Sequence, residues 1–141
     1  MRKYFVLMVM ILVMISSTGV CHAAAIEDNQ VDLQYIGTYS HYESISNKIG
    51  TLNFYGQLTP KADDSYDKVK ITLKVVNFVT NATVHIETKE VSYDTLYGYF
   101  IAESSCTAPT LGTYYLDVTY KCYKNGTLIE TITGQSKLLS I

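Results

Sequence analysis

Apolar and polar residues alternate along this chain with a period of two, and this limits what it can fold into more than any other feature. The alternation is clearest at residues 69–75, which read Val-Lys-Ile-Thr-Leu-Lys-Val. Successive side chains of a β-strand point to opposite faces, so this segment predicts a strand with one buried and one solvated face. No helical periodicity is sustained after Ala25. The pattern indicates an all-β fold.

Turn residues divide the alternating segments. Pro60 ends one of them, because proline cannot donate to a ladder, and Asn125-Gly126 suits a tight type I′ hairpin turn. The predicted strands are 31–35, 52–58, 68–75, 83–87, 96–104, 113–123 and 127–133. Seven short antiparallel strands are typical of an immunoglobulin-like β-sandwich. We expect this sandwich to be a single domain over residues 26–141, preceded by a signal peptide helix.

The segment 112–116 carries a more specific signal. It reads Gly-Thr-Tyr-Tyr-Leu, which matches the Gly-x-Tyr-x-hydrophobic pattern of a tyrosine corner at the start of a strand. The pattern predicts that the Tyr114 ring is buried and that its hydroxyl bonds to backbone just upstream. The alternative is an ordinary strand tyrosine.

The same segment carries a resemblance. Residues 112–120, together with Tyr-Lys-Asn-Gly at 123–126 and Glu-Thr at 130–131, resemble the last hairpin of small secreted proteins common in Gram-positive Firmicutes. The resemblance covers about the last quarter of the chain. It implies a signal peptide, an immunoglobulin-like sandwich and a Gram-positive source. Most of those proteins have no assigned function, so it supplies no catalytic residues.

The first 25 residues match a signal peptide. Arg2 and Lys3 precede an apolar run from 4 to 15, and Ala23-Ala24-Ala25 offers the small-x-small pattern of a cleavage site. A bilayer-spanning helix needs about 20 apolar residues, which is more than this run has. Cleavage is expected after Ala25, with cleavage after Ala23 as the alternative. We therefore expect a secreted, extracellular protein with no membrane anchoring.

The charge of the mature chain bears on its partners. Loss of Arg2 and Lys3 leaves 9 basic and 13 acidic residues, a net charge of −4. Nucleic acid is bound through clustered basic charge, so no nucleic-acid partner is expected.

Two cysteines remain after cleavage, Cys106 and Cys122, and in an exported domain they could pair. Strand geometry argues against pairing, because it places them about 30 Å apart whereas a disulfide needs Cα atoms within about 7 Å. A bridge would form only if residues 103–112 fold back over the sandwich. The sequence leaves the pairing open.

Candidate metal and catalytic residues are few. Asp63, Asp64 and Asp67 could hold Ca²⁺, but a solvated acidic turn explains them as well, and no other cofactor is expected. His41 is expected in a polar loop and His85 on the solvated face of a strand. Neither position is expected to provide a zinc site, or a base that activates a cysteine nucleophile. Without a Gly-x-Ser-x-Gly motif, we expect no enzyme. An acid pair for glycoside cleavage stays open.

Tyrosine is the most suggestive feature. Tyr55, Tyr115 and Tyr123 are predicted to point outward from strands, and further tyrosines are expected in or near loops, namely Tyr39, Tyr42, Tyr66 and Tyr93. Exposed tyrosine suits binding surfaces. The expected function is a non-enzymatic binding module for a protein or a cell-envelope component. The alternatives are a carbohydrate-binding module, which the lack of tryptophan disfavours, and a small secreted hydrolase.

Overall fold

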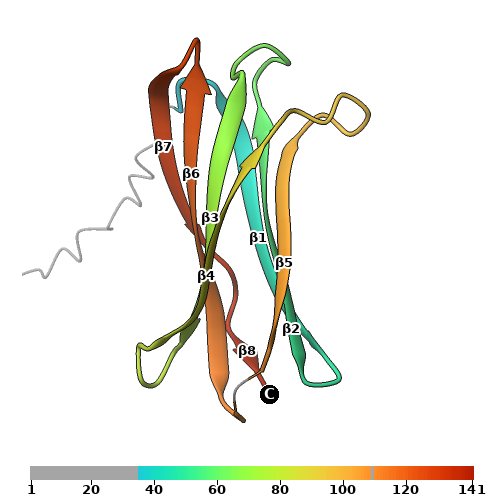
Figure 1. Cartoon of the computed structure of the whole chain (residues 1–141), viewed down its shortest axis with the longest axis vertical. Coiled ribbons are helices and arrows are strands. Elements are labelled where there is room, and N and C mark those ends of the chain that lie inside the picture. Colours follow the sequence, from blue (N-terminus) through green and yellow to red (C-terminus); the bar gives the residue numbers. More distant parts are fainter. Residues whose placement is uncertain (1–34, 109) are drawn as a thin grey trace, which may run out of the picture. The chain divides into compact units, whose positions relative to one another are not determined.

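The computed structural model describes residues 35–108 and 110–141, and these residues form two antiparallel β-sheets that pack face to face (Figure 1). The strands are β1 (Thr38–Lys48), β2 (Thr51–Pro60), β3 (Lys68–Asn77), β4 (Thr83–Val91), β5 (Phe100–Thr107), β6 (Thr113–Lys124), β7 (Thr127–Gln135) and the short β8 (Leu139–Ser140). One sheet has the order β1-β2-β5, and the other has the order β4-β3-β6-β7 with β8 also paired to β6.

The predicted fold class, an antiparallel immunoglobulin-like β-sandwich of about seven strands, is confirmed. The predicted signal peptide at 1–25 lies outside the described residues. Within the described part of the chain, no helix has the length and apolar character needed to cross a bilayer.

The core lies between the two sheets and is built mainly by β2, β3 and β6. Every second residue of these strands is buried, as the alternation predicts. The largest fully buried side chains are Tyr114, Tyr120, Phe54, Phe100, Leu52, Leu58, Ile71, Leu73, Leu116, Ile132, Val69 and Val75. Burial of each such side chain contributes about 1.5–3 kcal/mol, so this layer dominates the stability of the fold.

The first strand differs from the prediction. β1 occupies Thr38–Lys48, where the sequence suggests a polar loop, and only Tyr35 of the predicted strand at 31–35 lies among the described residues. The inward positions of β1 are His41, Glu43 and Ile45, so the strand lacks an apolar alternation. Its inward Glu43 accepts a hydrogen bond from Tyr120 of the other sheet, which no local pattern can reveal.

The orientation of β4 was also predicted wrongly. The register shifts between Val75 and Val76, which pair with His85 and Thr83, so Val84 is an extra residue on β4. A one-residue shift reverses the faces of all later side chains. His85 therefore lies opposite buried Val75 and faces the other sheet, whereas the sequence predicted a solvated position.

The fifth strand begins later than predicted, at Phe100 instead of Leu96. Before it, the Asp94 carboxylate accepts hydrogen bonds from the backbone N–H groups of Leu96 and Tyr97, at 2.9 and 3.2 Å. Gly98 follows with a φ of 79°. This Asx turn satisfies its own backbone and leaves only an isolated bridge between Asp94 and Tyr99 before β5 begins.

Candidate functional site

The three tyrosines predicted as a binding surface lie on two different faces. Tyr55 is on the outer face of the β1-β2-β5 sheet, whereas Tyr115 and Tyr123 are on the outer face of the other sheet. Tyr115 and Tyr123 are also about 26 Å apart along β6, at about 3.3 Å per residue. The structure therefore does not bring these three residues together.

Tyr115 and Tyr123 each have a local partner. The Tyr115 ring packs edge-on against Phe78, with ring centroids 6.4 Å apart. The amines of Lys68 and Lys70 lie over the Tyr123 ring, 5.8 and 5.6 Å from its centroid. The contacts of Tyr123 are those of a solvated, charged surface.

Tyr55 lies beside a tyrosine that the sequence placed near a loop. Tyr42 is exposed on β1, and its ring centroid is 5.9 Å from that of Tyr55, with 43° between the planes. The two are diagonal neighbours, because Tyr42 pairs with Gln57 and Tyr55 pairs with Ser44. Diagonal strand neighbours are within reach of aromatic side chains. Tyr66 lies in the β2–β3 loop, as the sequence predicts, but its ring is buried in the core and not exposed.

We call the outer surface of the β1-β2-β5 sheet the tyrosine face. Its outward side chains are mainly hydroxyls, amides and aromatics, with one isoleucine and two charged groups, Glu103 and Lys48 at the end of β1. They are Ser40, Tyr42, Ser44, Ser46, Lys48, Thr51, Asn53, Tyr55, Gln57, Thr59, Ile101, Glu103, Ser105 and Thr107. Protein-binding surfaces are enriched in tyrosine and depleted of charge, and antibody paratopes are rich in Tyr, Ser and Asn.

The outer surface of the other sheet has the opposite character. Ion pairs join neighbouring strands, with Lys68 and Lys70 at 3.3 and 3.6 Å from Glu90, and Lys74 at 3.9 Å from Asp117. These groups are partly exposed, and such pairs contribute little to stability. The two outer faces of the sandwich thus differ sharply in charge.

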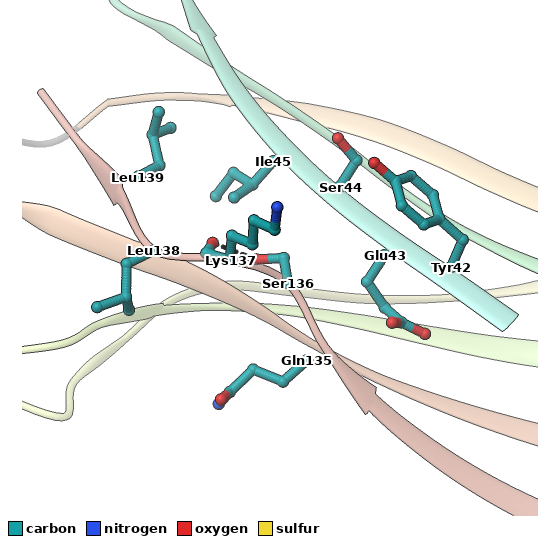
Figure 2. Close-up of a pocket in the computed structure, with 9 residues that line it drawn as sticks. All are labelled: Tyr42, Glu43, Ser44, Ile45, Gln135, Ser136, Lys137, Leu138 and Leu139. Atoms are coloured by element: carbon teal, nitrogen blue, oxygen red, sulfur yellow. Dashed lines mark hydrogen bonds between the residues drawn. The ribbon is translucent and has the colours of Figure 1, made fainter.

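A pocket of about 360 Å³ lies next to the tyrosine face, at the edge where β1 faces the end of β7 (Figure 2). Residues 42–45 of β1 form one wall, and residues 135–139 form the other. The Lys137 side chain lies between the walls, and Ile45 and Leu139 lie close together at one end (Figure 2). Because Tyr42 lines this pocket as well, the pocket and the tyrosine face are continuous.

The Glu43 side chain at the inner side of the pocket is almost fully buried. The Tyr120 hydroxyl donates to its Oε1 at 2.8 Å, and His41 Nδ1 lies 2.8 Å from the same oxygen. Burial, with the nearby Glu43 charge, raises the pKa of Tyr120. His41, predicted in a loop, is thus a strand residue, and this network joins the two sheets.

A second, partly buried carboxylate joins the start of β1 to β7. Glu130 accepts hydrogen bonds from the Ile36 N–H at 2.8 Å, from Thr38 Oγ1 at 3.2 Å and from the Tyr66 hydroxyl. Burial and the bond to Glu130 raise the pKa of Tyr66. The arrangement fixes the chain where it enters the sandwich.

Cys106 and Cys122 are free thiols in the structure, so the disulfide that the sequence left open is not formed. Cys106 pairs with Leu52 in one sheet, and Cys122 pairs with Val69 in the other. Burial, together with the Glu130 charge, raises the pKa of Cys122 to about 12. A thiol in this state is a poor nucleophile.

The acidic loop does not gather its carboxylates. The Tyr93 hydroxyl donates to Asp63 at 2.6 Å, while Asp67 accepts from the Asn125 N–H and lies 3.9 Å from Lys124. Among the described residues, no group of three or more His, Cys, Asp or Glu side chains is placed to hold a metal ion. Asp63 and Asp67 thus bond to separate partners within the protein.

His85 and Glu87 bridge the sheets on the β4 side. The His85 ring lies 5.5 Å from the ring of Phe54, and Ser104 Oγ donates to Glu87 at 2.5 Å. This hydrogen bond from Ser104 lowers the pKa of Glu87. Both residues have structural partners in the opposite sheet.

Tyr114 has the geometry of a tyrosine corner. Its ring is fully buried, and its hydroxyl donates to the carbonyl oxygen of Thr110 at 2.9 Å. The bond spans the connection between the two sheets, so it fixes the start of β6.

No protein-family model matches the chain, and no curated protein matches it. Among solved structures, a β-glucuronidase of Bacteroides uniformis is similar over 68% of this chain and 12% of its own, with 16% identity and a TM-score of 0.45. The structure of B. uniformis β-glucuronidase 2 bound covalently to cyclophellitol-6-carboxylate aziridine has the same identity and coverage and a TM-score of 0.44. The match thus spans only a small part of those enzymes.

Proposed function

We propose that this chain is a secreted, non-enzymatic binding module that engages a protein or another cell-envelope component through the tyrosine face. One observation carries the proposal: the outer face of the β1-β2-β5 sheet has only two charged side chains among its outward residues, Lys48 and Glu103, whereas the other outer face is covered by lysines and carboxylates. Charged groups are costly to dehydrate, so a face that loses water on binding is better with few of them.

The chemistry of the tyrosine face fits this role. Tyr42 and Tyr55 present a large apolar area with few rotatable bonds, so little conformational entropy is lost when a partner covers them. Ser44, Asn53 and Gln57 surround them with neutral donors and acceptors. Desolvation of neutral groups costs much less than desolvation of charges.

The adjoining pocket adds a place for one projecting group of a partner. It opens at the same edge, has Tyr42 in its wall, and contains the Lys137 side chain (Figure 2). An acidic or hydroxyl-bearing group would find a matching donor in Lys137.

A carbohydrate-binding module is the second candidate. The Tyr42–Tyr55 pair with the neighbouring Gln57 amide offers sugar a stacking surface and a hydrogen-bonding group. The 43° between the two rings favours a short or twisted glycan over a flat, crystalline one.

Co-sedimentation of the exported protein with Gram-positive cell walls and with insoluble polysaccharides tests both candidates. Mass spectrometry of the exported chain should show a start at Ile26, or at Ala24 for the alternative cleavage. We expect Tyr42→Ala and Tyr55→Ala each to weaken binding about tenfold or more, as central interface tyrosines do. Tyr123→Ala, on the charged face, is the matched control and should bind like the wild type.

The outcomes separate the candidates. Binding that is lost after protease treatment of the walls supports a protein partner, and retention on a purified polysaccharide supports the glycan reading. An equal loss with Tyr123→Ala would contradict the tyrosine face as the site.

A further inference from the structure

One end of the sandwich presents large apolar side chains at the tips of three separate loops. Ile49 in the β1–β2 turn is 95% exposed, Val79 in the β3–β4 loop is 80% exposed, and Leu111 in the β5–β6 loop is 87% exposed. Phe78, next to Val79, is exposed as well. We call these four residues the apolar tip.

Backbone hydrogen bonds show that the three loops share one end. The Ala108 N–H donates to the Gly50 carbonyl at 2.9 Å, which joins the β5–β6 loop to the β1–β2 turn. The Phe78 N–H donates to the Thr113 carbonyl at 2.8 Å, which joins the β3–β4 loop to the start of β6. All three loops lie at the lower end in Figure 1.

Ile49 has an unfavourable backbone conformation. Its φ is 52°, in the left-handed region, where a β-branched side chain is strained. The β6–β7 turn has almost the same geometry, with Asn125 at 49° in the matching position, and asparagine tolerates it. Since Ile49 is almost fully exposed, the fold gains no packing in return for this strain.

The charges of the two ends differ. The loop segments 47–50, 77–82 and 108–112 contain no Asp or Glu and one basic residue, Lys48. The opposite end carries Asp63, Asp64, Asp67 and Asp94 in its loops. The exposed Leu96 there lies next to the Asp94 carboxylate, which accepts a hydrogen bond from its N–H, whereas the three segments of the apolar tip carry no carboxylate side chain.

The backbone at the apolar tip is extensively satisfied within the protein. The Asn77 side-chain oxygen accepts from the N–H groups of Val79 and Thr80, both at 3.0 Å, and the Asn81 N–H donates to the Asn77 carbonyl at 2.8 Å. A loop that enters a lipid interface requires such bonds, because an unpaired polar group is costly there.

We propose that the apolar tip inserts into the interfacial region of a lipid bilayer. Ile49, Val79 and Leu111 reach the acyl boundary, and the Phe78–Tyr115 pair lies at headgroup level, where amphipathic aromatic rings are favoured. The inference goes beyond the proposed function, since it uses a different surface. It departs from the expectation of no membrane anchoring. That expectation used the sequence and its net charge, whereas the present proposal uses the positions of the charges and of the exposed apolar residues in the structure.

The geometry favours lipid over a protein partner or a second copy. Ile49, Val79 and Leu111 protrude from three separate loops. A stable protein interface buries about 800 Å² of contiguous surface on each side, which three separated loop tips do not provide. A fluid bilayer adapts to each tip independently.

Flotation with vesicles of phosphatidylcholine and phosphatidylglycerol tests this proposal on the exported protein. We expect the wild type to float, and Ile49→Asn, Val79→Ser and Leu111→Ser each to lower the partition coefficient about fivefold, the effect of removing one partly inserted aliphatic side chain. Leu96→Ser is the matched control, because Leu96 is also 80% exposed at a loop tip, and it should float like the wild type.

Salt and a second variant complete the test. With Lys48 as the one charge in these loops, flotation should change little between low and high salt. Tyr55→Ala should float normally, so that failure of the tyrosine face and failure of the apolar tip are distinguishable. A wild type that does not float, an equal loss with Leu96→Ser, or a dimer in sedimentation that Ile49→Asn abolishes would overturn the proposal.

Discussion

Ile49 and Asn125 occupy the same position of two-residue turns that differ by only a few degrees in φ, at 52° and 49°. Each is followed by a glycine with positive φ, Gly50 and Gly126. For an L-residue the left-handed conformation costs about 1–2 kcal/mol, and asparagine reduces this cost through local hydrogen bonding. The two turns therefore provide an internal comparison of side chains in one backbone geometry.

The comparison predicts opposite effects on stability. Ile49→Asn should raise the free energy of unfolding by about 1 kcal/mol, and Asn125→Ile should lower it by a similar amount. Urea denaturation followed by tyrosine fluorescence measures both. A loss of stability in Ile49→Asn would mean that Ile49 makes contacts within the fold that outweigh its strain.

Among the strands, β1 shows how a polar strand can be held in a sandwich. Its inward Glu43 occupies the space that Gly134 on β7 leaves free, because a Cβ at position 134 would clash with the carboxylate. Tyr120 and His41 supply the bonds that this buried group requires. The glycine is there for space and not for a special φ.

Gly134→Ala should therefore destabilise the protein by about 1–3 kcal/mol, the usual cost of overpacking a site without room. In a Glu43→Ala background the same substitution should cost much less, because the clashing carboxylate is gone. Urea midpoints of the four proteins give this coupling. Equal costs in both backgrounds would show that Gly134 serves another purpose.

The strands also show what the sequence can and cannot predict. The sequence predicts β2, β3 and β6, because apolar and polar residues alternate along them. Their apolar residues pack in the core, and this determines which side chains point inward. The sequence does not predict β1, since its inward Glu43 is satisfied in part by Tyr120 from a distant strand. The face of β4 depends on the extra residue Val84, and a single inserted residue leaves no mark in the alternation.

The candidate site was predictable only in part for the same reasons. Tyr55 could be placed on a strand surface, but its partner Tyr42 lies on the strand that the sequence does not reveal. To predict that one outer face is mostly neutral and the other charged, one must know which strands belong to which sheet. That assignment depends on long-range strand pairing, which the sequence alone does not show.

For the whole molecule, the buried acids predict a loss of stability at alkaline pH. Burial raises the pKa of Tyr66 and Tyr120 above 10.0, and raises that of Cys122 from 9.0 to about 12. The unfolded chain releases these protons at the ordinary values, while the folded protein retains them. Their contribution is therefore complete below pH 9 and is lost as the pH rises towards 12.

The free energy of unfolding, obtained from urea denaturation between pH 7 and 11, should stay level up to about pH 9 and then fall by up to about 1.4 kcal/mol per pH unit for each group. Cys122→Ala should make the decline above pH 9 shallower, whatever it does to stability at pH 7. A free energy of unfolding that stays constant up to pH 11 would contradict the burial of these groups.

The length of the strands has a consequence for where a partner can be. β3 has ten residues, which at about 3.3 Å each correspond to a height of roughly 33 Å between the two ends of the sandwich. With the apolar tip in lipid, the strands run approximately perpendicular to the membrane plane. The tyrosine face then points in a direction parallel to that plane. A partner would then be a lateral neighbour within that height, and the acidic loops would form the outermost layer, facing away from the membrane.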